Sequence, residues 1–330
     1  NRENVKLFSL FTISFTALLI VPIILTSMAE QTLDNIFFNK KIDNVFLVNS
    51  IQKHINKLAV DIGSRPITNE QSIKKTENYI TNYFKNIGLQ VQQQQYKYDN
   101  YDIANIIAGS QENLLSSKYY VIGAHYDSVP ETYGADDNAS GIAVLLELAR
   151  YTIQEKISLP VRFVAFTAEE PPTFSTRHQG SKVFVKSVKE KKDEILGAII
   201  LEMVGYTSNE QAYPMVLKWM GYPSKGNFIG IVGNRKSKKF GQSIFQSFKK
   251  NAQLPVETLF VPFNGWILPD TRLSDHSPFW DAGLPAVMIT DTAFFRNPNY
   301  HTPQDTFDTL DYFFMAELVK SLLVTLKKLS

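Results

Sequence analysis

Short apolar runs recur along the chain, each bounded by polar or turn-forming residues. Four of them are mainly aliphatic or aromatic and show no regular alternation with polar residues. They cover residues 119–122, 161–168, 196–201 and 286–290. Apolar runs of this length are typical of strands that are buried on both faces of a sheet. We therefore expect these four runs to be core strands.

The range 89–98 differs from these runs because its apolar residues alternate with glutamines. Such alternation predicts a strand with one exposed face, so we expect this range at an edge of the sheet, with 103–108 as its neighbour. Residues 228–232 and 257–263 are also predicted to be extended.

Amphipathic helices are predicted between these strands. The helix over 69–87 is introduced by Pro66 and Thr68 and stopped by Gly88. Further helices are expected over residues 50–61, 141–150, 181–191, 237–252 and 310–329. His54 falls among lysines in the first of these, where an ordinary surface histidine is expected. The alternation of helices and strands predicts an α/β fold, with a single mixed, mostly parallel twisted sheet flanked by helices.

The N-terminal end has a different character. Residues 7–25 contain no charged side chain, and a length of about 20 such residues matches one membrane-spanning helix. Arg2 and Lys6 precede this run and acidic residues follow it, so the positive-inside tendency predicts that everything after Met28 is exported. Residues 27–29 also resemble a small-residue cleavage site, which leaves a removed signal peptide as the alternative. We favour an uncleaved anchor, because the apolar run is long for a signal peptide.

The chain is thus expected to have three parts. Residues 1–29 form a membrane anchor or signal sequence, 30–49 a connector, and 50–330 one large domain that faces the periplasm or the exterior. The 330 residues are 44% hydrophobic and 12% aromatic, enough for a substantial core. The net charge of +2 gives no indication of nucleic-acid binding. Because the chain has no cysteine, any metal must be held by histidine and carboxylate groups.

Side chains that can bind a metal come at the ends of three of the buried strands. His125 follows the first, Glu169-Glu170 the second and Glu202 the third. Catalytic groups of open α/β sheets gather where such strands end. Each of these groups alone would suit a solvated polar turn, but chance is a poor explanation for the repetition.

The neighbours of these side chains suggest separate tasks. Asp127, two residues after His125, is placed to hold the second ring nitrogen of a metal-bound histidine. In the Glu169-Glu170 pair one carboxylate can ligate a metal while the other faces a substrate as a base. Further along, Asp275 is placed as the N-cap of a helix, and for the adjacent His276 a structural role is favoured over metal binding.

From about residue 50 onward the chain resembles the co-catalytic zinc aminopeptidases of peptidase family M28. The motifs that carry the resemblance occur in the family's order. They are His-x-Asp at 125–127, Gly-Ala-Asp-Asp-Asn-Ala-Ser-Gly at 134–141, Glu-Glu at 169–170, the acid at 202, Ser-Asp-His at 274–276 and His-Thr-x-x-Asp-Thr at 301–306. The resemblance implies an aminopeptidase that acts on peptides with a free N-terminus.

The resemblance also implies the roles of individual residues. One zinc would be held by His125 and Glu202, and a second by Glu170 and His301. Asp137 would bridge the two ions, because the bridging acid of this motif lies three residues before the Ser of Ala-Ser-Gly. Glu169 would be the general base. Asp127 and Asp275 would support the ligands from behind.

The sequence departs from better-known family members in two ways. Glu202 stands where many members have Asp, and the tyrosine that some use as an oxyanion donor is not found among residues 271–273. Two alternatives remain. The first is acyl transfer with a single zinc, as in the glutaminyl cyclases of the same fold, and the second is a membrane-tethered, non-catalytic binding domain. Both rank lower, because every metal position is filled by a competent side chain.

Overall fold

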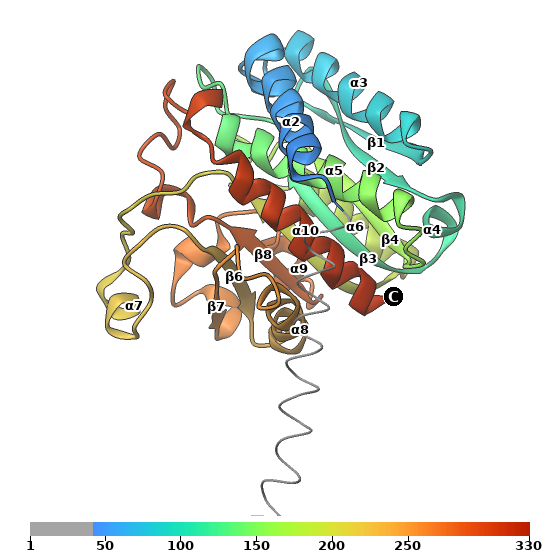
Figure 1. Cartoon of the computed structure of the whole chain (residues 1–330). Coiled ribbons are helices and arrows are strands. Elements are labelled where there is room, and N and C mark those ends of the chain that lie inside the picture. Colours follow the sequence, from blue (N-terminus) through green and yellow to red (C-terminus); the bar gives the residue numbers. More distant parts are fainter. Residues whose placement is uncertain (1–41) are drawn as a thin grey trace, which may run out of the picture. The chain divides into compact units, whose positions relative to one another are not determined.

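Four parallel strands form the centre of an eight-stranded sheet in the computed structural model, which describes residues 42–330 apart from the side chains of residues 215 and 216. They are β3 (Lys118–His125), β4 (Val161–Phe166), β5 (Glu194–Glu202) and β8 (Ala286–Thr290). The strand order is β1-β2-β4-β3-β5-β8-β6-β7 (Figure 1). All four apolar runs of the sequence are therefore core strands, as predicted.

The outer strands make the sheet mixed. On one side, β1 (Gln90–Tyr98) and β2 (Tyr101–Gly109) pair antiparallel, and β1 is the edge strand that the glutamine alternation predicts. On the other side, β6 (Ile229–Asn234) runs antiparallel to β8 and parallel to the edge strand β7 (Val256–Val261). Four of the seven strand pairs are parallel, which confirms the predicted mixed sheet.

Helices cover both faces of the sheet (Figure 1). One side carries α2 (Asn44–Ile55), the π-helix η1 (Asn56–Ile62), α3 (Glu70–Asn86), α5 (Gly141–Gln154), α8 (Lys238–Phe248) and α10 (Tyr312–Leu329). The other carries α6 (Gly180–Lys191) and α9 (Ser277–Asp281). The remaining short helices are α4 (Gln111–Leu115), η2 (Ala135–Ser140), α7 (Met215–Trp219), η3 (Phe263–Gly265), η4 (Pro269–Arg272), η5 (Ala293–Phe295) and η6 (Phe307–Thr309).

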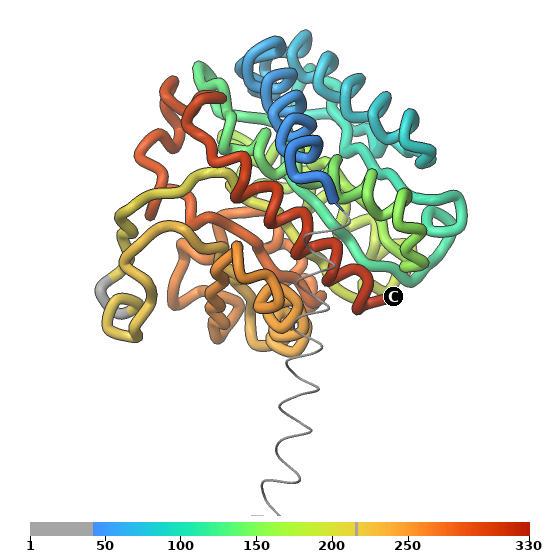
Figure 2. The backbone as a smooth tube through the Cα atoms, viewed as in Figure 1, coloured from blue at the N-terminus to red at the C-terminus, as the bar shows by residue number. Residues whose placement is uncertain are grey.

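The two ends of this unit pack together. In Figure 2, α10 at the C-terminus runs beside α2 and α5. Lys320 of α10 donates a hydrogen bond to Asn44 Oδ1 at the start of α2, at 3.0 Å. On the other face, α6 and α9 bury Phe184, Phe279 and Trp280 against β3, β4 and β5. Each large apolar side chain buried in this way contributes about 1.5–3 kcal/mol.

Three local predictions need correction. The first helix runs from Asn44 through η1 to Ile62 rather than over 50–61, and His54 within it is only 2% exposed. Asp275 is not a helix N-cap, because α9 begins at Ser277 and His276 is its N-cap residue. Instead the buried carboxylate of Asp275 accepts hydrogen bonds from Ser181 Oγ at 2.5 Å and Gln179 Nε2 at 3.1 Å.

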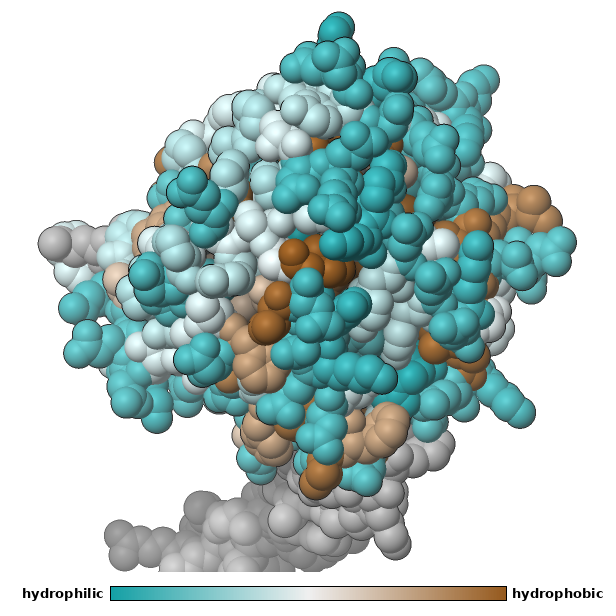
Figure 3. Space-filling model, turned by 90° about the horizontal axis from the view of Figure 1, so that it is seen from above, coloured by the Kyte–Doolittle hydropathy of each residue, from teal (hydrophilic) through white to brown (hydrophobic). Residues whose placement is uncertain are grey.

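The predicted membrane segment, residues 7–25, lies outside the described residues. Within residues 42–330, no helix is both long and apolar enough to span a membrane. The face shown in Figure 3 is mainly hydrophilic, with hydrophobic residues gathered in a few small patches.

Candidate metal centre

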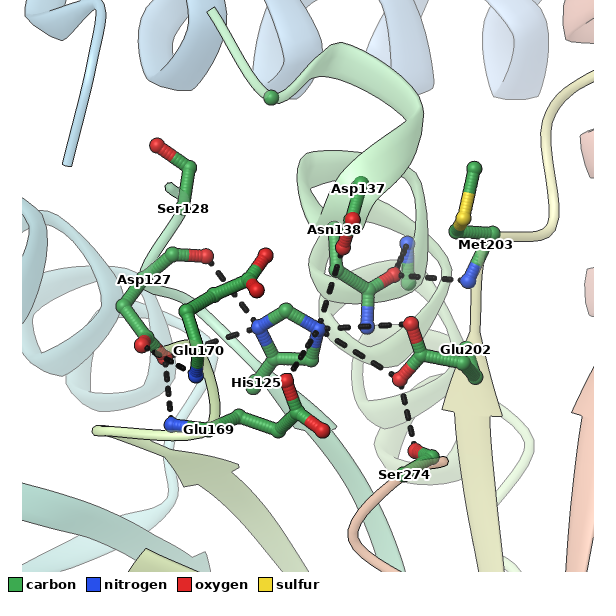
Figure 4. A network of polar contacts seen from close by, with 12 residues as sticks. His125, Asp127, Ser128, Asp137, Asn138, Glu169, Glu170, Glu202, Met203 and Ser274 are labelled. Atoms are coloured by element: carbon green, nitrogen blue, oxygen red, sulfur yellow. Dashed lines mark hydrogen bonds and ion pairs between the residues drawn. The ribbon is translucent and has the colours of Figure 1, made fainter. Parts of the chain in front are cut away.

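Six predicted site residues come together at the carboxyl edge of the parallel strands. His125 is the last residue of β3 and Glu202 the last of β5, while Glu169 and Glu170 follow the end of β4. Asp137 comes from η2, ahead of α5, and His301 from the loop after β8. Because the central strands are parallel, their ends lie at the same edge and bring these distant segments together. Figure 4 shows the side chains of His125, Asp137, Glu169 and Glu202 pointing toward one another.

The two carboxylate oxygens of Asp137 face two different histidines. His125 Nε2 lies 3.3 Å from Asp137 Oδ1 and 3.4 Å from Glu202 Oε2. On the other side, His301 Nε2 lies 3.2 Å from Asp137 Oδ2 and 3.3 Å from Glu170 Oε2. In each of the groups His125–Asp137–Glu202 and Asp137–Glu170–His301, the potential ligand atoms all lie within 4.8 Å of one another. Two potential metal sites therefore share Asp137.

The donor set fits a pair of divalent ions. Imidazole nitrogens and carboxylate oxygens are suitable zinc ligands where no thiolate exists. Glu170 Oε1 is buried and has no hydrogen-bond donor among the described residues, and the buried Asp137 Oδ1 has only the 3.3 Å contact with His125 Nε2. A buried carboxylate oxygen without a donor is costly, and coordination to a cation would remove that cost.

The pKa shifts at this site also indicate a need for positive charge. Burial and the neighbouring Asp137 raise the pKa of Glu170 to about 8. Burial opposes the charge of His301, but its contacts with Asp137 and Glu170 outweigh burial and raise its pKa to about 10. Burial likewise opposes ionisation of Asp137, yet His125 and His301 lower the pKa of this carboxylate. The carboxylates thus stabilise whatever positive charge lies between them.

Glu169 lies beside the shared site with a largely buried side chain. Its Oε2 is 3.9 Å from His125 Nε2. Burial raises its pKa well above the ordinary value, and although His125 opposes the shift, Glu202 and Glu170 add to it. A carboxylate in this environment has an increased affinity for a proton, as a general base requires.

Asp127 supports both His125 and the Glu169-Glu170 turn. Its main-chain oxygen lies 3.2 Å from His125 Nδ1, and its carboxylate oxygen Oδ1 lies 3.5 Å from the same nitrogen. The carboxylate also accepts hydrogen bonds from the backbone N–H groups of Glu169, at 3.2 Å, and Glu170, at 3.0 Å. Asp127 therefore fixes the position of the turn that carries both glutamates.

The Ser274–Asp275–His276 segment has a different arrangement from the one expected. Asp275 is buried behind the site, and burial raises its pKa to about 7. Its neighbour Ser274 contacts a candidate ligand directly, because Ser274 Oγ donates a hydrogen bond of 2.7 Å to Glu202 Oε2. His276 belongs to none of the potential metal groups of the described residues and lies 2.7 Å from the Thr271 carbonyl oxygen, as favoured for a structural histidine.

Two further residues hold the Asp137 turn in place and were given no role in the sequence analysis. Asp305 accepts hydrogen bonds from the backbone N–H groups of Asp136, at 2.8 Å, and Asp137, at 3.1 Å. Asn138 donates to the carbonyl oxygen of Leu201 at 2.9 Å and so ties this turn to the end of β5. Asp305 belongs to the quoted motif at 301–306, so the sequence contained a signal for it.

Arg65 connects η1 to the loop between His125 and Asp137. Its guanidinium is fully buried and donates only to backbone carbonyl oxygens, at 2.8–3.0 Å. These oxygens belong to Leu58, Gly63, Tyr126, Tyr133 and Gly134. Burial lowers the pKa of Arg65 to about 10, so its charge persists at neutral pH.

Tyr300 lies between the metal centre and an adjacent apolar pocket. Its ring stacks on the His301 imidazole, with centroids 3.7 Å apart and an interplanar angle of 19°. It lines the pocket together with Glu202. Burial and then Asp137, with the other site carboxylates, raise the pKa of its hydroxyl, which therefore stays protonated.

Comparison with known proteins gives matches over most of the chain. The model of peptidase family M28 matches residues 102–325. The uncharacterized protein YfbL of Escherichia coli is 35% identical over 290 residues, which are 84% of this chain and 86% of YfbL. Aminopeptidase YwaD of Bacillus subtilis is 28% identical over 64% of this chain, but the match spans only 41% of YwaD.

Solved structures share the fold at lower identity. The LapA aminopeptidase of Legionella pneumophila has a TM-score of 0.67 and 19% identity, covering 86% of this chain and 71% of LapA. A glutaminyl cyclase of Tannerella forsythia has a TM-score of 0.62 and 18% identity, covering 85% of this chain and 98% of the cyclase. At these identities the likeness extends to the fold, and both chemistries occur on it.

Proposed function

The chain belongs to peptidase family M28, and on that premise we propose that it is a di-zinc aminopeptidase that removes the N-terminal residue from peptides. The observation that carries the proposal is the shared position of Asp137 between two groups of potential ligands. His125 and Glu202 would complete one site, and Glu170 and His301 the other. Two divalent ions bound there would lower the pKa of a water molecule and stabilise the oxygens of a tetrahedral intermediate.

Glu169 is proposed as the general base. It would take a proton from the attacking water and pass it to the amine of the leaving peptide. Its burial and its raised pKa support this role, because the carboxyl group can hold the proton between the two transfers. Asp127 would keep the carboxylate in place through the backbone of the same turn.

Tyr300 is proposed as the missing hydrogen-bond donor to the developing oxyanion. Its ring stacks on His301, and Tyr300 lines the pocket that Glu202 also lines. Tyr300→Phe should lower kcat about 10- to 100-fold, which is equal to or somewhat smaller than the usual effect of removing one hydrogen-bond donor to an oxyanion. The two ions and the Tyr300–His301 ring contact should remain, and unchanged kcat would assign Tyr300 to the pocket wall alone.

A glutaminyl-cyclase-like acyl transfer is the second candidate, and it is supported by the shared fold. Such chemistry uses a single zinc, whereas this chain has a full set of side chains for two. A product assay separates the two activities, because cyclisation of an N-terminal glutamine releases ammonia and leaves the peptide bonds intact. A non-catalytic binding domain would give neither product.

The decisive experiment compares one peptide with a free and with an acetylated N-terminus. We expect release of the first residue only from the free peptide, because an acetylated nitrogen can neither coordinate a metal nor pair with a carboxylate. The same preparation should contain two zinc ions per chain by elemental analysis. Equal cleavage of both peptides would contradict the proposal and indicate an endopeptidase or another hydrolase.

We also propose that the catalytic domain is exported and remains attached to the membrane. The support is the uncharged run 7–25 behind Arg2 and Lys6. Fractionation of cells that express the chain should give a membrane-bound protein whose domain is digested by externally added protease. A soluble product that starts near Glu30 would show a cleaved signal peptide, and protein protected in the cytoplasm would contradict export.

A further inference from the structure

The lining of the apolar pocket beside the metal centre includes Glu202 and Tyr300. Its walls are mainly aromatic and aliphatic and come from the 213–228 segment, from β6, β7 and β8, and from the loops that follow β7 and β8. The main apolar contributors are Tyr213, Leu217, Tyr222, Phe228, Leu259, Met288 and Phe295. A pocket of this kind next to a reactive centre suits one side chain of a bound substrate.

One row of paired residues leads across the sheet from the metal centre into this pocket. Glu202 of β5 pairs with Thr290 of β8, Thr290 with Gly230 of β6, and Gly230 with Glu257 of β7. Paired residues of neighbouring strands point to the same face of a sheet. At about 4.8 Å for each strand step, Glu202 and Glu257 are roughly 14 Å apart along the row.

Gly230 leaves the middle of this row open because it has no side chain. A Cβ atom built there would meet nothing closer than 3.5 Å, so only the lack of a side chain keeps the space free. A long side chain that enters beside Glu202 can therefore lie over Gly230 and reach toward Glu257.

The charged residues among the described lining of the pocket are all acidic. Its described lining contains the carboxylates of Glu202, Glu257 and Asp270 but no lysine, arginine or histidine. Glu257 is partly buried, forms no ion pair with a described residue, and has a pKa raised by burial. The nearby Arg296 is not one of the lining residues. It lies against Phe228 and donates to Gln211 and the Tyr206 carbonyl oxygen, while its Nη2 is buried without a partner among the described residues and its charge acts on the Tyr213 hydroxyl.

A partly buried carboxylate beside apolar walls is less well solvated than an exposed one, and a cation that enters the pocket would compensate for the lost solvation. The aromatic walls add to the preference, because the faces of tyrosine and phenylalanine rings attract cations. The Tyr213 hydroxyl is buried and has no hydrogen-bond partner among the described residues, so it offers an additional acceptor.

We propose that Glu257 determines specificity for a basic N-terminal residue, lysine or arginine, whose aliphatic stem lies along the apolar walls over Gly230. This inference rests on the proposed aminopeptidase function and names its substrate class. Glu257 acts through binding of the side chain and takes no part in the bond cleavage.

The test compares peptides that differ only in the first residue: lysine, Nε-acetyl-lysine and leucine. Wild type should prefer lysine over Nε-acetyl-lysine by about 10- to 100-fold in kcat/KM, the scale of a desolvated charged hydrogen bond. Glu257→Gln should lower the lysine-to-leucine ratio by a similar factor. Gly230→Leu places a side chain in the open part of the row. It should lower kcat/KM for peptides that begin with lysine or arginine more than for a peptide that begins with alanine.

Glu194→Gln is a matched control. This exposed glutamate lies at the start of β5, at the opposite end of the strand from Glu202, and pairs with Lys118. It should leave both activity and preference unchanged. A wild type that favours leucine, with a ratio that Glu257→Gln does not alter, would overturn the inference while leaving the aminopeptidase intact.

A binding measurement keeps the inference testable if turnover is absent. Calorimetric titration of the zinc-loaded protein with L-lysine amide and L-norleucine amide should show tighter binding of the lysine compound, and this difference should disappear in Glu257→Gln. Equal affinities in wild type would refute the role of Glu257. Lack of release from every free peptide would instead refute the proposed function.

Discussion

Two buried clusters of histidine and carboxylate occur within residues 42–330, and only one of these two has the properties of a metal centre. The second lies where α2, α3 and α5 meet, around Glu147. There, Glu147 Oε1 accepts hydrogen bonds from Ser50 Oγ at 2.8 Å, His54 Nε2 at 3.0 Å and Tyr83 Oη at 2.8 Å, and Oε2 pairs with Arg150. One carboxylate is thus surrounded by donors. The cluster is complete without any other group.

The metal centre has the opposite balance. Asp137, Glu169, Glu170 and Glu202 gather around two histidines, and the buried Oε1 of Glu170 has no hydrogen-bond donor in the part of the chain that the structure describes. The presence of histidine and acid together therefore says little about function. The ratio of carboxylate oxygens to donors separates a structural cluster from one that is built for a cation.

Replacement of Asp137 should have the largest effect. Because Asp137 belongs to both the His125–Asp137–Glu202 and the Asp137–Glu170–His301 group, Asp137→Ala should lose the metal pair and at least ~1,000-fold of the activity, more than the loss of one oxyanion donor. Elemental analysis and kinetics measure the two effects. Glu147→Gln is the control and should keep both ions. Retention of two zinc ions in Asp137→Ala would show that Asp137 is not the bridging ligand and would contradict the assigned difference between the two clusters.

The next effect concerns Glu169, which belongs to the acidic cluster but is not expected to be a ligand. Glu169→Gln should keep two zinc ions and the fold yet lose at least ~100-fold in kcat, the scale of a positioned proton-transfer group. Metal analysis and kinetics on the same sample distinguish this outcome from loss of metal. Near-wild-type turnover would require another base.

A smaller effect, on stability alone, is expected in the second cluster. Glu147→Gln replaces a carboxylate that accepts from several donors, and should lower the free energy of unfolding by about 1–3 kcal/mol. Denaturant titration measures this change in the zinc-free protein, so that bound metal does not contribute. A loss of zinc from Glu147→Gln would show that metal binding depends on the Glu147 cluster and would contradict the independence of the two clusters.

The smallest effect is the acid dependence of the Glu147 contribution. Burial opposes ionisation, but His54 and Arg150 outweigh it and lower the pKa of Glu147 to about 2 from an ordinary 4.5. A depressed folded-state pKa gives stability that is complete above the unfolded-state pKa and is lost as the pH falls through the folded-state value. The difference in stability between wild type and Glu147→Gln should therefore shrink between about pH 4.5 and about pH 2. A constant difference over this range would contradict the ionised Glu147.

Much of this organisation follows from the order of residues along the chain. The apolar runs predict the central strands, and parallel strands bring their ends to one edge, so His125, Glu170 and Glu202 could be expected near one another. The burial of His54 in the Glu147 cluster could also have been predicted from the sequence. Leu47, Ile51, His54 and Ile55 have the spacing of one helix face, so His54 occupies a core position despite the lysines next to it.

Other contacts were not predictable, because they join segments whose approach depends on the tertiary fold. The Ser274–Glu202 hydrogen bond connects residues 72 positions apart, and the Arg65–Tyr126 bond connects residues 61 positions apart. Neither side chain has a periodicity or a flanking turn signal that points to its partner. The pairing of Gly230 with Glu257 is of the same kind, since strand register depends on how the outer strands pack.

The buried guanidinium of Arg65 bears on how much of the chain is needed for a working enzyme. The region that matches the family begins at residue 102, whereas Arg65 lies well before it and satisfies carbonyl oxygens on the loop that leads to Asp137. A fragment that begins at residue 102 would lack the guanidinium that pairs with those oxygens. Helices α2 and α3, which flank Arg65 in the chain, therefore belong to the smallest autonomous unit.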